Sequence, residues 1–349
     1  MPYIIFTPTA THWDAFVRAH PDAHALQLSA WGAHQSRFGW QPQCIAIADP
    51  TGRLLAGAQI LLRRLPLRLG VRAYAPAAPL FSDDEAANTL LWGALRRSGA
   101  AFIKFEPCNW YRPRPDLPER LIQAGLRPSP QTVQIPRTIV LDLSGTEEDI
   151  LKRMNQSTRY KCRLGPKKEV SVRQGDSADA LRFGQLMQLT AQRDGFHARP
   201  PEYYQSAYDA FAPSGEVVLL IASYNGQDLA GAMIFRCGEN AYYFYGASSD
   251  AERNRMPTYI LQWEAIRWAK AHGALRYDLW GIPDADVATL EAEFEKREDG
   301  LWGVYKFKRG FGGEVRRSVG AWDLVNNRAL YALYTWYVRR QQQRLGKNA

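Results

Sequence analysis

The sequence has few cysteines and no apolar run long enough to cross a membrane. Its four cysteines are scattered over 349 residues without a Cys-x-x-Cys pair, which supports neither a zinc knuckle nor a disulfide framework. The six histidines have no metal-ligand spacing, and we expect no metal and no cofactor. The apolar segment Leu54–Leu62 is too short for a membrane span and contains Gln59, and the first ten residues lack the basic region of a signal peptide. Reduced thiols and the missing signal predict a cytoplasmic protein.

The motifs of covalent catalysis are also missing. The sequence contains no Gly-x-Ser-x-Gly elbow, Walker loop, Rossmann fingerprint or His-Glu-x-x-His motif. Covalent catalysis through serine or cysteine is therefore not indicated. A reaction that depends on positioning and electrostatic stabilisation fits the residue types better.

The charge balance is strongly basic. The formal net charge is +9 and the pI is about 9.4, while 46% hydrophobic residues are enough for ordinary cores. Such a balance favours a polyanionic partner: a nucleic acid, a nucleotide-linked substrate or an anionic membrane surface. The alternative is that the charge serves solubility alone.

One stretch organises the second half of the chain. An aromatic strand, Tyr242–Tyr245, is followed by a polar loop with Arg253 and Arg255, and apolar residues then recur at helical spacing from Thr258 to Gly273. A second strand follows at Leu275–Trp280. The helix carries the chain back across the sheet, so the two strands are predicted to be parallel. The loop lies at the helix N-terminus, a place that favours anions.

The two halves of the chain share three short motifs in the same order, which argues for two copies of one α/β domain. The offsets between the copies are 174, 171 and 174 residues. The pairs are Leu55-Ala-Gly-Ala58 with Leu229-Ala-Gly-Ala232, Trp92–Arg96 with Trp263–Arg267, and Gly99-Ala100 with Gly273-Ala274. We therefore predict a mixed α/β fold with one domain at 1–142 and a second, similar domain at 143–320. The segment 321–349 is predicted to return to the first domain, with one long basic helix over Leu324–Arg344. The alternative is a helix that lies on a membrane surface.

Two basic segments could carry chemistry. Arg199 and Tyr203 lie in a segment that follows a predicted helix, and an arginine fork with tyrosine hydroxyls suits a diphosphate. The alternative is a surface loop with capping charges. Tyr305–Glu314 is predicted to be a strand that ends in a glycine turn, with Lys306 and Lys308 on one face and Phe307 on the other. A lysine held at the end of a sheet could stabilise an oxyanion.

Together, several stretches resemble the FemABX aminoacyltransferases, which build peptidoglycan cross-bridges. They follow the family's order over nearly the whole chain: Gln27–Trp31, Phe102–Pro107, Arg159–Arg163, Arg199–Tyr204, Tyr243–Ser249, Tyr277–Ile282 and Phe307–Glu314. The resemblance implies two tandem GNAT-like domains, with the acceptor bound by the first (1–142) and the catalytic residues and the tRNA side in the second (143–320). It also implies transfer of an amino acid (Gly, Ala or Ser) from aminoacyl-tRNA to the side-chain amine of the peptidoglycan stem peptide, carried by UDP-MurNAc-pentapeptide or lipid II.

The resemblance also implies roles for single residues. Lys308 and Phe307 match the family's catalytic Phe-Lys pair, and Arg199 and Tyr203 match its diphosphate-binding residues. Glu106 falls where the family commonly has an aspartate on the acceptor wall. Near Trp31 an expected lysine is missing, and Arg37 is one of the basic residues close by. Candidates for the tyrosine that lines the acceptor site are Tyr243, Tyr245 and Tyr259.

Two other functions stay open at this point. An acyl-CoA-dependent N-acyltransferase on the same fold usually has a glycine-rich pyrophosphate turn, whereas the corresponding loop Arg253–Thr258 has no glycine. A non-enzymatic RNA-binding protein would use the basic and aromatic segments but would leave Lys308 and Arg199 without a role. The expected partners are an aminoacyl-tRNA and a UDP-linked or lipid-linked precursor. We expect a monomer in peripheral contact with the inner face of the plasma membrane.

Overall fold

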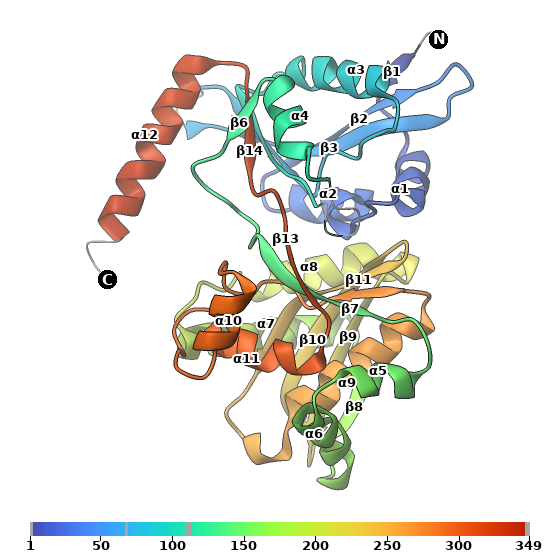
Figure 1. The fold of residues 1–349 in the computed structure, drawn as a ribbon, viewed down its shortest axis with the longest axis vertical. Helices are drawn as coiled ribbons and strands as arrows, with labels where there is room; N and C mark the ends of the chain where they lie inside the picture. The colour runs from blue at the N-terminus through green and yellow to red at the C-terminus, as the bar shows by residue number, and fades with distance from the viewer. Residues whose placement is uncertain (1–2, 67–68, 109, 111–113, 346–349) are drawn as a thin grey trace. The chain divides into compact units, whose positions relative to one another are not determined.

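The computed structural model describes residues 3–66, 69–108, 110 and 114–345, and the chain divides into two compact units (Figure 1). The first unit comprises residues 1–22, 26–134 and 318–349, and the second comprises residues 23–25 and 135–317. Residues 346–349 of the predicted terminal segment lie outside the described residues. Of the described residues, none belongs to a helix with the length and apolarity needed to cross a bilayer.

Within the described residues, each unit contains one sheet of seven strands. The strands of the first sheet are β1 (Ile4–Phe6), β2 (Gln41–Ala48), β3 (Leu54–Arg64), β4 (Val71–Pro76), β5 (Phe102–Glu106), β6 (Leu126–Pro128) and β14 (Trp322–Val325). The strands of the second are β7 (Arg137–Asp142), β8 (Ser171–Gln174), β9 (Val217–Tyr224), β10 (Gln227–Cys237), β11 (Asn240–Ser248), β12 (Arg276–Asp278) and β13 (Glu314–Arg317).

The two sheets have the same topology. The first runs β1-β2-β3-β4-β5-β14-β6 and the second runs β8-β9-β10-β11-β12-β7-β13. In both, the fourth and fifth strands are parallel and the other neighbours are antiparallel. The predicted parallel pair is β11 and β12. This correspondence confirms the mixed α/β fold with two similar domains that the sequence repeat predicts.

The sixth strand of each sheet comes from a different part of the chain than its neighbours suggest. In sequence it follows the strands of the other unit. β7 comes after β6 but pairs with β12 and β13, whereas β14 comes after β13 but pairs with β5 and β6. The predicted boundary after residue 142 therefore assigns β7 to the first domain, although β7 belongs to the sheet of the second unit. Short repeats could not reveal this exchange, because β7 and β14 contain none of the repeated letters.

Both units carry α-helices between their strands. Those of the first unit are α1 (Ala10–Ala19), α2 (Ser29–Ser36), α3 (Glu85–Arg96), α4 (Leu117–Gln123) and α12 (Arg328–Leu345). Those of the second are α5 (Glu147–Arg153), α6 (Gln156–Lys167), α7 (Ser177–Asp194), α8 (Pro201–Phe211), α9 (Pro257–Ala271), α10 (Val287–Glu293) and α11 (Trp302–Lys308).

The terminal helix α12 packs on the first unit, as predicted. The Tyr331 and Phe102 ring centroids are 5.5 Å apart, and the Tyr331 hydroxyl donates to Asp323 Oδ2 at 2.9 Å. The predicted helix start near Leu324 is wrong, because Leu324 is a fully buried residue of β14 and pairs with Ile103 of β5.

In the second sheet, β11 and β12 separate at one end. Their parallel pairing ends at Tyr242 and Asp278, while β11 continues to Ser248. Close to this point Phe244 of β11 forms a bulge, because Met233 and Ile234 of β10 pair with Tyr245 and Tyr243 and leave Phe244 without a partner in the register. Bulges bend a strand and change where its side chains point. Four of the predicted site residues, Lys308, Phe307, Tyr243 and Tyr259, lie around these separated strand ends.

Candidate active site

Lys308 is buried where β12 ends. Its side chain projects from the last turn of α11, and the residue is only 6% exposed. Nζ donates to the backbone oxygens of Trp280 and Gly281 at 3.1 and 2.8 Å. Nζ also lies 5.7 Å from the ring centroid of Tyr243 on β11. The ammonium group is therefore held between the two strands that separate.

The segment around Lys308 is a helix, and the predicted strand Tyr305–Glu314 is wrong over its first part. Trp302, Tyr305 and Lys308 are buried at intervals of three residues, whereas Lys306 is exposed. A spacing of three to four residues marks one face of a helix. The Lys-Phe-Lys alternation imitates a strand over too few residues, and the aromatic spacing that starts at Trp302 is the better signal. A strand does follow, at β13.

Burial weakens the positive charge of Lys308. Desolvation lowers its pKa from 10.5 to about 7, and the nearby Asp278 carboxylate opposes this shift. Asp278 is itself fully buried, and Oδ1 accepts hydrogen bonds from the Thr138 hydroxyl and, at 2.7 Å, from the Trp280 N–H. Burial also raises the pKa of Tyr243 to about 12. Lys308 is thus a group whose charge changes near neutral pH.

The two carbonyls that hold Lys308 depend on an unusual backbone. Trp280 has φ = +63°, a left-handed conformation that is rare for a large residue and is often found at functional sites. A Cβ atom at Gly281 would come within 2.3 Å of the Ile135 side chain, so this position requires glycine. Sequence reasoning missed Trp280, Gly281 and Asp278 as site residues, although Trp-Gly directly after a strand was a usable signal.

Phe307 belongs to an aromatic group beside Lys308. Its ring is 5.0 Å from Tyr259 of α9 and 5.1 Å from Phe311, measured between centroids. Lys161 of α6 reaches the same group, with Nζ 3.3 Å from the Tyr259 hydroxyl and 4.8 Å from the ring centroid. The structure therefore brings together Lys308, Phe307, Tyr243 and Tyr259, and it adds Lys161.

Arg199 and Tyr203 form a second group. Arg199 is exposed just before α8, and its Cζ lies 5.5 Å from the Tyr203 ring centroid. Tyr203 and Tyr204 are buried in the first turns of α8 rather than in a loop, since Pro201 is well suited to the first position of a helix. The Arg199 N–H donates to the Tyr204 hydroxyl at 3.2 Å, which fixes the backbone that presents the guanidinium.

Tyr245 joins this second group and belongs to the same strand as Tyr243. Its ring centroid is 6.4 Å from that of Tyr203 and 5.1 Å from that of Tyr204. Burial raises the pKa of Tyr245 well above the ordinary value. Strand β11 thus connects the two groups, with Tyr243 at Lys308 and Tyr245 beside Arg199.

Glu106 lies in the first unit, and both oxygens of its carboxylate accept hydrogen bonds. Oε2 accepts from the Tyr74 hydroxyl at 2.6 Å, and Oε1 accepts from the Val133 N–H at 2.5 Å. The Gln134 N–H also donates to Oε2, at 3.0 Å. Burial raises the pKa of Glu106, while these hydrogen bonds oppose the shift. Glu106 therefore anchors the segment that leaves the first unit, a role that its place in the sequence did not indicate.

Trp31 and Arg37 also lie in the first unit, at α2. Trp31 is buried with its ring centroid 5.1 Å from that of His34, whereas Arg37 is exposed at the C-terminal end of the helix. Trp31 supports packing, and Arg37 is the member of this pair that a ligand could reach.

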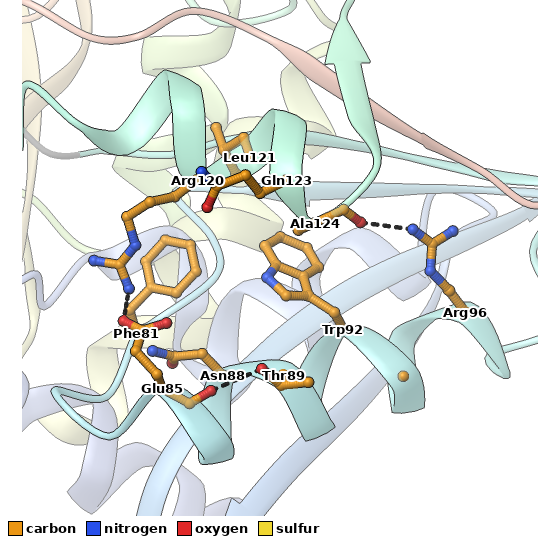
Figure 2. Close-up of a pocket in the computed structure, with 11 residues that line it drawn as sticks. Phe81, Glu85, Asn88, Thr89, Trp92, Arg96, Arg120, Leu121, Gln123 and Ala124 are labelled. Carbon is orange, nitrogen blue, oxygen red and sulfur yellow. Dashed lines mark hydrogen bonds and ion pairs between the residues drawn. The ribbon is translucent and has the colours of Figure 1, made fainter.

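A pocket of about 410 Å³ lies between α3 and α4 of the first unit (Figure 2). The Trp92 indole stands in it, with the Arg120–Glu85 ion pair on one side and Arg96 on the other. The predicted site residues do not line this pocket. Helix α3 follows the fourth strand of its sheet and α4 follows the fifth. In the second unit, α9 follows the fourth strand and carries Tyr259, while α10 and α11 follow the fifth strand and α11 carries Phe307 and Lys308.

The fold is shared with solved structures. A crystal structure of FemX has a TM-score of 0.84 at 23% identity, covering 95% of this chain and 99% of that one. A tandem GNAT protein from the clavulanic acid biosynthesis pathway has a TM-score of 0.54 at 10% identity, covering 93% and 99%. These comparisons show a fold of two tandem GNAT-like domains.

The family follows from the sequence comparisons. The FemAB family pattern matches residues 125–228 and 220–339. The lipid II:glycine glycyltransferase of Staphylococcus saprophyticus is 24% identical, with 92% of each chain covered. The chain belongs to the FemAB family, as the sequence motifs predict.

Proposed function

We propose that this transferase moves glycine, alanine or serine from an aminoacyl-tRNA to the side-chain amine of a peptidoglycan stem peptide. The acceptor is carried by UDP-MurNAc-pentapeptide or lipid II. The staphylococcal relatives, named as lipid II:glycine glycyltransferases, support the reaction class. With a lipid-linked acceptor the reaction would take place at the inner face of the plasma membrane.

The observation that carries this proposal is the environment of Lys308. The Lys308 amine is held in one place by two backbone carbonyls in a site that excludes water, and below its pKa of about 7 it carries a positive charge there. Preorganised charges of this kind stabilise developing oxyanions more strongly than water does. The aminoacyl ester is already activated, so the reaction needs no covalent intermediate.

The chemical step follows from this arrangement. The neutral acceptor amine attacks the ester carbonyl, and a C–N bond forms as the carbonyl oxygen becomes an oxyanion facing Lys308. The ester C–O bond then breaks, and the proton lost by the amine ends on the ribose oxygen of the departing tRNA. Phe307 and Tyr259 shield the reacting carbonyl from water, which would otherwise hydrolyse it.

The acceptor side of the proposal rests on Arg199. Arg199 is exposed beside three tyrosines, Tyr203, Tyr204 and Tyr245. Its guanidinium can present two parallel N–H groups to a diphosphate. The nearby Arg193 already pairs with Asp194 at 2.6 Å and Asp250 at 3.1 Å, which leaves Arg199 as the better candidate.

An acyl-CoA donor fits the loop before α9 poorly. Pyrophosphate is bound at helix N-termini by free backbone N–H groups. Here Pro257 has none, and the Met256 and Tyr259 N–H groups donate to Arg253 O and Met256 O at 3.0 and 3.1 Å. The Arg255 guanidinium lies 3.3 Å from the Tyr224 ring centroid and donates to Lys168 O.

The test is a transfer assay with purified protein. tRNAs charged with glycine, alanine or serine are each incubated with UDP-MurNAc-pentapeptide or with lipid II in detergent, and the acceptor mass is measured. We expect a mass increase of one amino acid with at least one pair. Acyl-CoA with the same acceptors is the parallel arm. Transfer from acyl-CoA alone, or from no donor, contradicts the proposal.

A further inference from the structure

Helix α6 is basic along its whole length. It directly precedes β8, the first strand in the order of the second sheet, whereas no described helix precedes β1, the matching strand of the first sheet. It carries Arg159, Lys161, Arg163 and Lys167 and has no acidic residue. Figure 1 shows α6 beside α9 within the second unit, and the two helices are in contact. Of these basic side chains, Lys161 contacts the aromatic group beside Lys308.

One face of α6 is fixed against α9. Cys162 is buried, with Sγ 3.5 Å from the backbone oxygen of Tyr259, and a Cβ atom at Gly165 would lie 2.6 Å from the Ile260 side chain. Glycine at this position therefore permits the close approach of the two helices. Because this face is covered, the opposite face is held toward solvent.

That opposite face presents an aromatic ring followed by two basic groups. Tyr160 is 64% exposed, the Arg163 side chain is 58% exposed, and Lys167 is exposed. Residues at i, i+3 and i+7 lie along one stripe of a helix. The ion pair of Arg163 with Glu148, at 3.5 Å, is exposed and contributes little. We call Tyr160, Arg163 and Lys167 the α6 stripe.

The α6 helix is joined to the Lys308 site at two points. At its N-terminal end, the Asn155 N–H donates to Gly310 O at 3.0 Å, two residues after Lys308. Along its inner edge, Lys161 contacts Tyr259, which packs on Phe307. A polymer lying along α6 therefore has a path of cationic and aromatic side chains that ends at Lys308.

We propose that the α6 stripe binds the sugar-phosphate backbone and one base near the acceptor end of the donor RNA. This inference rests on the proposed function and deepens it by assigning a donor surface. Lysine and arginine neutralise phosphates, and an exposed aromatic ring stacks on any base. A membrane partner fits less well, because a surface-bound helix needs a free apolar face and that of α6 is packed against α9.

The first experiment measures binding without catalysis. Uncharged tRNA is titrated against wild-type protein, Arg163→Ala/Lys167→Ala, Tyr160→Ala and Tyr160→Phe at several salt concentrations. We expect the double variant to bind about 10- to 100-fold more weakly, with a shallower salt dependence, because each phosphate contact adds about 0.7–0.9 to the logarithmic slope. Tyr160→Ala should bind more weakly, while Tyr160→Phe keeps the stacking ring and the affinity. The matched control is Arg182→Ala/Lys296→Ala, which removes two exposed charges elsewhere in the second unit.

The second experiment uses two donors in the transfer assay. For the Arg163→Ala/Lys167→Ala variant, kcat/KM should fall for full-length aminoacyl-tRNA and stay near wild type for an aminoacylated dinucleotide, because the inference assigns the stripe to nucleotides before the last two. Equal tRNA affinity in the stripe and control variants overturns the inference. So does a loss of binding to anionic vesicles while tRNA binding is kept. If wild-type protein transfers from neither donor, the proposed function fails, and the binding titration still decides whether α6 holds RNA.

Discussion

Lys308 and Gly281 are joined by a hydrogen bond of 2.8 Å from the buried ammonium to the backbone oxygen. The bond links the end of α11 to the turn after β12. It fixes the lysine charge at the point where β11 and β12 separate. The activity and pH dependence of this protein should therefore depend on this one side chain.

Replacing Lys308 by methionine tests its role directly. The side chain keeps its length and apolar stem but loses the charge that faces the oxyanion. We expect kcat to fall about 100-fold or more, as for loss of an oxyanion donor, with the acceptor KM nearly unchanged. Lys306→Met is the control, since Lys306 is exposed on the same helix. A Lys308→Met enzyme with wild-type kcat excludes the role, and a trapped acyl-enzyme overturns direct transfer.

The pH profile of kcat/KM should level off above neutrality. The pKa of Lys308 is about 7, so the free enzyme loses the ammonium as the pH rises through this value. The neutral fraction of the acceptor amine rises with pH up to its ordinary pKa of about 10.4, and above pH 7 this gain offsets the loss of the ammonium. We expect a plateau above pH 7 in the wild type and a continued rise in Lys308→Arg, because arginine stays protonated. A plateau that persists in that variant assigns it to another group.

Stability should depend on pH in the same window. The folded pKa of Lys308 is lower than the ordinary 10.5, so between about pH 7 and 10.5 the unfolded chain holds a proton that the folded protein has released. Unfolding then takes up a proton, and the free energy of unfolding rises with pH over this range. In Lys308→Met this rise should be smaller. Urea unfolding at pH 7, 8 and 9 measures the difference.

Arg199→Met should weaken acceptor binding. A charge-assisted hydrogen bond contributes about 1.5–3 kcal/mol, which corresponds to roughly 10- to 100-fold in KM. We expect this increase for the diphosphate-linked acceptor, whereas a stem peptide without the diphosphate should be used equally by both enzymes. Arg182→Met, on α7, is the charge-matched control. An unchanged acceptor KM removes Arg199 from the site.

The buried ion pair Lys104–Asp323 should be essential for the first sheet. Lys104 Nζ lies 3.2 Å from Asp323 Oδ1, and both side chains are buried. Removing one partner of a buried pair costs about 3–5 kcal/mol, because the other charge is left uncompensated. We expect Asp323→Leu and Lys104→Met to be strongly destabilised and the double variant to recover much of the loss. Denaturant unfolding measures all three, and additive losses would show that the two groups do not interact.

The exchanged strand predicts how fragments behave. A chain of residues 1–134 lacks β14, which lies between β5 and β6. We expect it to show no cooperative unfolding transition, whereas the same chain with residues 318–345 joined after residue 134 should fold. Near-ultraviolet circular dichroism distinguishes the two fragments. A folded 1–134 fragment would mean that the sheet closes without β14.

The sequence by itself determined the elements whose signals are local. The helical spacing from Thr258, the two strands around it and the repeated motifs predicted α9, a parallel strand pair and a duplicated α/β fold. The motif matches also predicted the FemAB family. These patterns need only neighbouring residues, because burial of one face repeats every two residues in a strand and every three to four in a helix.

Only the tertiary structure decided which distant residues meet. Asp323 pairs with Lys104, 219 positions earlier, and β14 enters a sheet whose other strands lie before residue 129. Glu106 holds Val133 and Gln134, and Trp280 and Gly281 turn their carbonyls to Lys308. Such contacts depend on chain topology and side-chain packing, and no local periodicity encodes them. For the same reason the sequence predicts a strand at Lys308 where the structure has a helix. A short Lys-Phe-Lys pattern is compatible with a strand and with a helix, and the burial of Trp302 and Tyr305 on the same face as Lys308 shows the helix.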